Sequence, residues 1–185
     1  MSEVTTRVRR TRDQVDALLD DGRTRDLALL VARVALAWIF VYHGASTLFG
    51  AFSGPGIARS ATFYAGVAHL HPGTFFAVLG GSIEFFGGIA VGVGVFGRIA
   101  AALLVGDMVM AMITVTFANG IVSTAAGSGY EINLALAALA LVVACMGTGR
   151  FSLDRAWRAR SGDRPPHGDR TPEAASPPSA EVSSI

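Results

Sequence analysis

Three ionisable side chains lie in stretches of sequence that are otherwise apolar, and they are the first candidates for chemistry. These residues are Arg33, Glu84 and Asp107. A charge at the centre of a membrane helix costs about 2.5–3.5 kcal/mol on the insertion scale, so each group needs a partner or a function. The predicted depths of Arg33 and Glu84 differ by only about 6 Å at 1.5 Å per helical residue. We therefore expect an Arg33–Glu84 ion pair that faces the interior of a helix bundle.

Asp107 is a second carboxyl group at a similar predicted depth. Burial and a neighbouring like charge both favour the protonated form of a carboxyl group, so we expect Asp107 to hold a proton. That proton would belong to a relay, or Asp107 would be a neutral acid that donates one hydrogen bond. Both roles stay open, and Glu84 and Asp107 are the candidate catalytic residues.

Four glycines surround Glu84 on one helical face, at positions three and four residues before and after it. They are Gly80, Gly81, Gly87 and Gly88. Small residues let helix backbones approach closely in lipid, and they also leave room for a flat ligand. The same glycines would suit the interface of a homo-oligomer, so packing, ligand binding and self-association all remain open.

A second polar group is expected near the ends of the predicted helices that lie farthest from Arg33. His43 and Glu131 would exchange protons there near neutral pH, or they would be ordinary interfacial residues. His69 and His71 have no partner motif, so no metal site is predicted. The full set of polar residues in this group is Tyr42, His43, Thr47, Thr116, Asn119, Tyr130, Glu131 and Asn133.

Four apolar stretches position all of these side chains. Hydrophobic residues make up 51% of the 185-residue chain and charged residues only 16%. Each stretch is close to the 17–25 residues that a helix needs to cross a bilayer, and unpaired backbone groups in lipid favour a helix. We expect an all-α membrane protein, a bundle of four transmembrane helices. Their predicted ranges are 27–49, 74–96, 99–117 and 130–146.

Arginine placement predicts the orientation and the domain limits. Basic residues cluster in a polar segment, 1–26, in the turn that holds Arg98, and after residue 149. Positive flanks lie in the cytoplasm, so both termini are expected there, around a membrane domain at 27–154. Proline and polar residues predict a disordered tail at 155–185. Residues 11–21 suggest an amphipathic helix, and 50–73 either a short interfacial helix or a plain loop. The split arginines give no indication of nucleic-acid binding.

Several motifs together resemble a known family. The run from Leu30 to Gly50 contains Arg33 and a Tyr-His-Gly triplet, the second stretch contains Gly81-Ser-Ile-Glu84-Phe-Phe-Gly-Gly88, and Asn119-Gly120 follows the third. Gly129-Tyr-Glu-Ile-Asn133-Leu and Gly149-Arg-Phe-Ser-Leu-Asp154 come later. Across about 26–154 the chain resembles the DoxX family of small bacterial inner-membrane proteins. Family motif positions fall on Arg33, His43, Gly44, Glu84, Asn119, Gly120, Glu131 and Asn133.

The resemblance implies a four-helix membrane fold related to the small subunit of thiosulfate:quinone oxidoreductase. It also implies a place in a membrane oxidoreductase complex of the bacterial inner membrane. Our leading hypothesis is a quinone-associated subunit of such a complex, in which Arg33 and Glu84 orient the head group and Asp107 supplies or takes the proton. The alternatives are a scaffold that recruits soluble redox enzymes through its tails and a small transporter, so the chain need not be an enzyme. No flavin, haem or metal ligand set is predicted. This chain has Thr47 where the family usually has lysine, and Thr116 and Phe117 where it often has histidine.

Overall fold

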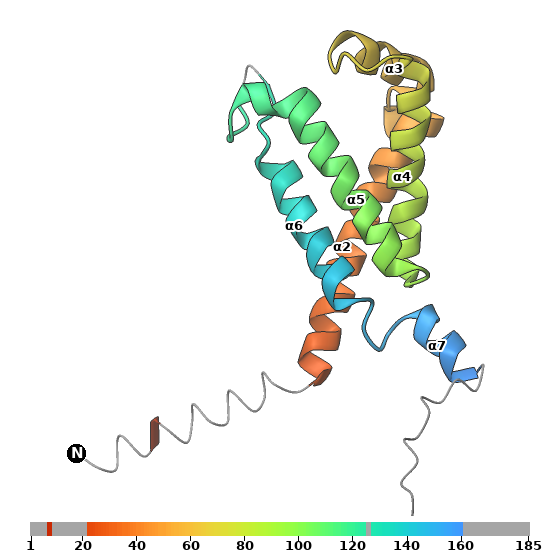
Figure 1. The fold of residues 1–185 in the computed structure, drawn as a ribbon, viewed down its shortest axis with the longest axis vertical. Helices are drawn as coiled ribbons and strands as arrows, with labels where there is room; N and C mark the ends of the chain where they lie inside the picture. The colour runs from red at the N-terminus through yellow and green to blue at the C-terminus, as the bar shows by residue number, and fades with distance from the viewer. Residues whose placement is uncertain (1–6, 9–21, 125–126, 161–185) are drawn as a thin grey trace, which may run out of the picture.

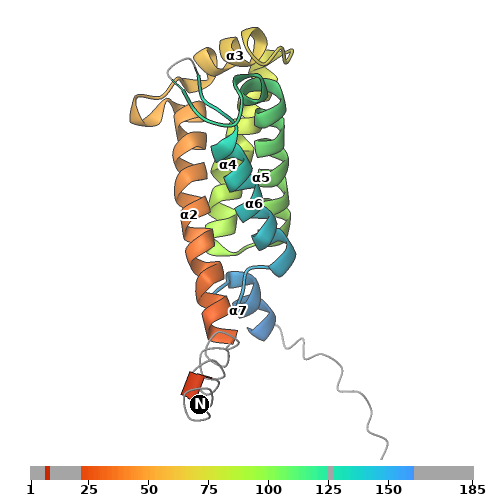
Figure 2. The ribbon, with the colours of Figure 1, turned by 90° about the vertical axis from the view of Figure 1, so that its left-hand side faces the viewer.

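The computed structural model describes residues 7–8, 22–124 and 127–160 as a set of helices without an extended strand in those ranges. Four helices form a bundle, and two short helices lie at its two ends (Figures 1 and 2). The bundle helices are α2 (Gly22–Phe49), α4 (Gly73–Val93), α5 (Gly97–Ala111) and α6 (Glu131–Met146). The end helices are α3 (Gly56–Gly66) and α7 (Leu153–Arg160). Helix α5 continues through a π-helical segment, η2 (Met112–Thr116). The two short 3₁₀ turns are η1 (Ala51–Ser53) and η3 (Phe117–Asn119).

All four predicted bundle helices are present, with ends that differ from the prediction by a few residues. Three of them are long and apolar enough to cross a membrane: α2, α4, and α5 with its continuation to Asn119. The fourth, α6, is a shorter apolar helix of 16 residues. The largest difference at a helix start is that of α2 at Gly22, five residues before the predicted start, because the polar residues there continue the same helix.

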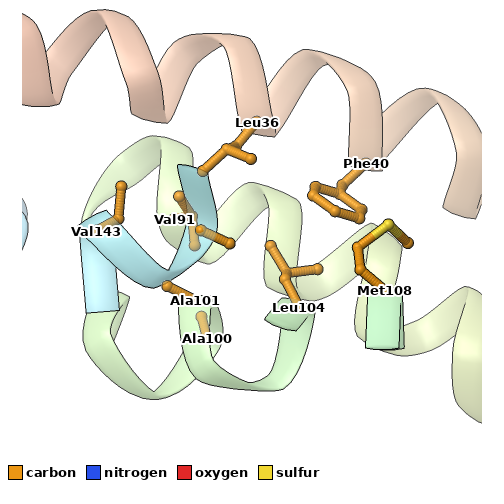
Figure 3. Close-up of a cluster of buried hydrophobic side chains, with 9 residues drawn as sticks. Leu36, Phe40, Val91, Ala100, Ala101, Leu104, Met108 and Val143 are labelled. Carbon is orange, nitrogen blue, oxygen red and sulfur yellow. The ribbon is translucent and has the colours of Figure 1, made fainter. Parts of the chain in front are cut away.

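The helices pack as neighbours in chain order, and α2 lies against α4. The α3 end of the bundle carries η1, α3 and the loop after η3, whereas the α7 end carries α7 and the first turns of α2 (Figures 1 and 2). All four bundle helices contribute to the buried core, which includes Leu36, Val91, Leu104 and Val143 (Figure 3).

The outside of the bundle is apolar. Trp38 is 78% exposed, and Phe86 and Ile113 also lie on the surface although they belong to the long helices. An exposed apolar surface of this extent is expected where a protein faces another apolar phase. Together with the span lengths, this surface indicates that lipid surrounds the helices.

The C-terminal helix α7 changes one of the predicted domain limits. Residues 155–160 belong to α7, so the disordered tail does not begin at residue 155 as predicted. In α7, Leu153 and Trp157 are four residues apart and share one helical face, an amphipathic pattern that was not predicted from the sequence. The rest of the predicted tail and the predicted helix at 11–21 lie outside the described residues. The short helix predicted within 50–73 is present as α3.

Candidate functional site

Arg33 of α2 is the most deeply buried charged side chain among the described residues, with 1% of its surface exposed. Its guanidinium donates hydrogen bonds only to backbone carbonyl oxygens. Nε donates to Val91 O at 2.7 Å and Nη2 to Gly92 O at 2.7 Å. Nη1 donates to Thr148 O at 2.7 Å and to Phe151 O at 2.8 Å. Arg33 therefore joins α2 to the end of α4 and to the loop between α6 and α7.

The predicted Arg33–Glu84 ion pair is wrong, and the end of α4 explains why. The last carbonyls of a helix have no partner within the helix. Gly94, with φ +78°, closes α4 with its N–H on Ala90 O, which leaves the next two carbonyls to Arg33. Glu84 lies seven residues before Val91, about 10 Å along the helix. The predicted depths concerned the side chains of Arg33 and Glu84 alone, so they gave no indication of these backbone acceptors.

Two aspartates, Asp26 and Asp154, make further contacts between segments at the α7 end. Asp26 of α2 accepts a hydrogen bond from Arg150 N at 3.0 Å and lies 3.8 Å from Arg150 Nε. Asp154 accepts one from Phe96 N at 3.2 Å, and its own N–H donates to Gly94 O at 3.1 Å. The 149–154 motif is thus a structural joint between α6, α7 and the α4–α5 turn.

A separate polar group lies inside the bundle, toward the α3 end, and its centre is Gly80 of α4. A Cβ added to Gly80 would lie 2.9 Å from the Tyr64 hydroxyl oxygen and 3.6 Å from Asp107 Oδ1. The phenol of α3 and the carboxyl group of α5 therefore meet over this glycine. Glu84 follows one turn later on α4, and the negative charges of Glu84 and Asp107 both act on Tyr64. Three helices thus bring Tyr64, Glu84 and Asp107 together.

The surroundings of this group change the pKa of Tyr64, which belongs to α3 and lies outside the spanning helices. Burial, followed by the negative charges of Glu84 and Asp107, raises the pKa of Tyr64 to about 12. The phenol therefore keeps its proton and remains a hydrogen-bond donor at neutral pH. In the described part of the chain, neither carboxyl group makes a hydrogen bond or an ion pair with another residue. Their oxygens remain available to a ligand.

The other three glycines around Glu84 pack against neighbouring helices. Gly81 faces Leu48 and Thr47 of α2, with an added Cβ at 3.0 Å. Gly88 faces Phe40 and Val41 of α2 at 3.1 Å, and Gly87 faces Leu104 of α5 at 3.3 Å. Helices α2, α4 and α5 therefore pack through glycine, and Gly80 is the member of the set that borders the polar group.

The predicted group at the α3 end is divided. Asn119 Nδ2 donates to Ser128 O at 3.0 Å, Asn133 Nδ2 donates to Thr116 Oγ1 at 3.2 Å, and Glu131 Oε1 accepts from Ser123 N at 3.0 Å. These three residues hold the loop between η3 and α6. His43 packs edge-on against Tyr42, with ring centroids 5.7 Å apart, and no hydrogen bond or ion pair joins it to Glu131. Among the described residues, no cluster of three or more metal-ligating side chains occurs.

Tyr64 was not predicted as a member of the site. It lies within 50–73, for which the sequence predicted only a short interfacial helix or a plain loop. The spacing of Gly80 and Glu84 marks one face of α4, but nothing in the sequence indicates that α3 folds back over that face. Only the tertiary structure brings Tyr64 and Asp107 together, because they belong to different helices.

A bundle of apolar-surfaced helices around interior carboxyl groups defines a multi-pass membrane protein. The family model DoxX matches residues 28–117, and this match supports the assignment of the chain to the DoxX family. The matched region spans α2 to η2 and includes Arg33, Tyr64, Glu84 and Asp107; Asn119, Glu131 and Asn133 lie beyond it. No curated protein and no solved structure matches the chain.

Proposed function

We propose that this DoxX protein is the membrane subunit of an oxidoreductase complex and binds a quinone beside Tyr64, Glu84 and Asp107. The observation that carries the proposal is the meeting of the Tyr64 hydroxyl and the Asp107 carboxyl group over Gly80. Both carboxyl groups there are without a hydrogen bond to other residues of the described chain. Polar groups at this depth in a membrane bundle mark functional sites more often than structural ones.

The donor set fits a quinone head group. Its carbonyl oxygens accept hydrogen bonds, and a phenol and a neutral carboxyl group both donate them. Gly80 presents no side chain, whereas an alanine Cβ would lie 2.9 Å from the Tyr64 hydroxyl. When bound, a quinone supplies reversible two-electron chemistry that takes up two protons.

The residues of the chain then have separate tasks. Tyr64 orients the ligand with a hydroxyl group that stays protonated, because its pKa is raised to about 12. Asp107 and Glu84 hold or move a proton between α5 and α4. Arg33 fixes the end of α4 against α2 through Val91 and Gly92, so it is a positioning residue rather than the head-group ligand expected from the sequence. Electrons reach the quinone from a partner redox enzyme.

The proposal places the protein in the bacterial inner membrane with α6 as a fourth span and both termini in the cytoplasm. Two features support it. The start of α2 and α7 lie at the same end of the bundle (Figure 2). That end also carries Arg25, Arg98 and Arg155, as the positive-inside rule requires of a cytoplasmic side.

The test is the amount of quinone that co-purifies with the full chain in mild detergent, measured by mass spectrometry. We expect Glu84→Gln, Asp107→Asn and Tyr64→Phe each to lower bound quinone about tenfold or more, since one lost hydrogen bond to a charged or buried partner is worth about 1.5–3 kcal/mol. Glu131→Gln is the matched control, because it removes the same charge at the first residue of α6, outside the group of Tyr64, Glu84 and Asp107.

A second readout shows whether the acidic variants keep the site intact. In a Tyr42→Phe/Tyr130→Phe background, Tyr64 is the remaining tyrosine, and ultraviolet titration reports its pKa. We expect Glu84→Gln or Asp107→Asn to lower this pKa from about 12 toward the ordinary value, because a negative charge is removed. A pKa lowered in this way, combined with unchanged quinone content, would overturn the proposed site.

A further inference from the structure

A cavity of about 1440 Å³ lies at the α7 end, between α7 and the helix ends of the bundle. We propose that this cavity binds the phosphate-bearing head group of an anionic phospholipid. The proposal concerns the opposite end of the bundle from Tyr64 and does not depend on quinone binding.

The cavity is built from parts of the chain that are far apart in sequence. Its lining comes from the first turns of α2, the α4–α5 turn, the end of α6 and α7. Arg33 fixes the loop that leads into α7, because it donates hydrogen bonds to Thr148 O and Phe151 O. The buried Asp26 fixes the same loop through Arg150 N at 3.0 Å. The cavity is therefore part of the folded structure.

Its charges favour an anion. Four arginines line it: Arg25, Arg98, Arg155 and Arg160. Their guanidinium groups make no hydrogen bond or ion pair with another described residue. The two acidic residues in the lining are already engaged, Asp26 with Arg150 and Asp154 with Phe96 N. Guanidinium groups bind phosphate oxygens with strong, often bidentate hydrogen bonds.

Its apolar walls favour a lipid over a free anion. Phe96 is 72% exposed and Trp157 is 77% exposed, and both line the cavity. Ile99 and Met146 extend the lining onto the exposed sides of α5 and α6, which face lipid. Aromatic rings together with arginines, at the level where spanning helices end, are the composition of a membrane interface. An acyl chain can therefore follow α5 and α6 while its phosphate meets the arginines.

The experiment is native mass spectrometry of the full chain in detergent, titrated with phosphatidylglycerol or with phosphatidylcholine of the same acyl chains. We expect phosphatidylglycerol to bind more tightly. Each arginine near a lipid surface contributes about a fivefold factor in affinity. Arg98→Gln should therefore weaken phosphatidylglycerol binding about fivefold, and Arg98→Gln/Arg155→Gln about 25-fold.

The matched control is Arg59→Gln, which removes an exposed arginine from α3 at the other end of the bundle and should leave the affinity unchanged. Thermal unfolding shows that the variants compared are folded. Equal loss in Arg59→Gln, no loss in the double variant, or equal binding of both lipids would overturn the proposal. So would inorganic phosphate binding as tightly as the lipid, or a soluble protein that occupies α7 and excludes the lipid. Glu84→Gln should not change lipid binding, so this inference and the quinone proposal fail separately.

Discussion

At the scale of single residues, Arg33 shows how a membrane helix bundle accommodates a charge without an ionic partner. Carbonyl oxygens of Val91 and Gly92 carry the negative end of the α4 dipole, and cations are stabilised at the C-terminus of a helix. Thr148 and Phe151 add two acceptors from another segment. The guanidinium fork suits this arrangement because its N–H groups point in fixed, separate directions.

This geometry predicts a large effect of Arg33→Lys on stability. An ammonium group has three donors and no planar fork, so it cannot reach acceptors on both α4 and the α6–α7 loop. We expect a loss of about 3 kcal/mol in the free energy of unfolding in detergent, because buried carbonyls are left without partners. Denaturant titration followed by circular dichroism measures it. Arg59→Lys on exposed α3 should change the free energy by less than about 0.5 kcal/mol; equal effects of the two variants would contradict the role given to Arg33.

At the scale of elements, the α2–α4 pair depends on close backbone contact. A Cβ added to Gly44 of α2 would lie 2.7 Å from Phe85 Cα, which is backbone and cannot turn away. Gly81 and Gly88 make the same kind of approach from the α4 side. Glycine lets two membrane helices approach closely. The close contact between α2 and α4 on both sides of Glu84 therefore fixes the position of Glu84 in the bundle.

The prediction for this pair compares two glycine-to-alanine substitutions in helices. Gly44→Ala should destabilise the protein by about 1–3 kcal/mol, the usual cost of overpacking, as measured by unfolding in detergent. Gly106→Ala on α5 is the control, since no atom lies within 4 Å of its added Cβ. Alanine has the better helix propensity, so this variant should be unchanged or more stable by up to about 1 kcal/mol. A destabilised Gly106→Ala with a normal Gly44→Ala would contradict the packing.

Much of the element plan was predictable from sequence, whereas the contacts between elements were not. Hydropathy and length predicted the helices of the bundle because lipid leaves the backbone no other arrangement. Glu84 and Asp107 were correctly identified as interior groups, since they interrupt apolar helices. Arg33 received the wrong partner because its acceptors are carbonyls, which every residue carries and no pattern marks. Tyr64 was missed for a related reason, since only the folding back of α3 brings it to Gly80.

At the scale of the whole molecule, the two ends of the bundle differ in chemistry. The α7 end carries exposed arginines and the joint around Arg33, whereas the α3 end is closed by α3 and by a loop that Asn119, Glu131 and Asn133 hold in place. The sides between them are apolar. The positive-inside rule favours one orientation of such a molecule, and the proposed topology therefore has the basic end in the cytoplasm.

The orientation predicts the behaviour of reporters fused to the chain. A fluorescent protein that folds only in the cytoplasm should be active when fused after Arg160. It should be inactive when inserted between α3 and α4 at Leu70. A phosphatase that needs the periplasm should give the opposite pattern at both sites. Two active fluorescent fusions would mean that the α3 end does not cross the membrane, and would contradict the four-span topology.

The hydrogen bonds of Arg33 also set a constraint on the order of synthesis. Arg33 precedes its acceptor Thr148 by 115 positions in the chain. At about 5–20 residues per second, a ribosome completes that interval in roughly 6–23 s. During that time α2 is in the membrane with a charge that has only part of its final set of acceptors. A chain that stops before Thr148 therefore lacks two of the four acceptors of Arg33, so we expect its α2–α4 pair to be held less firmly than in the complete chain.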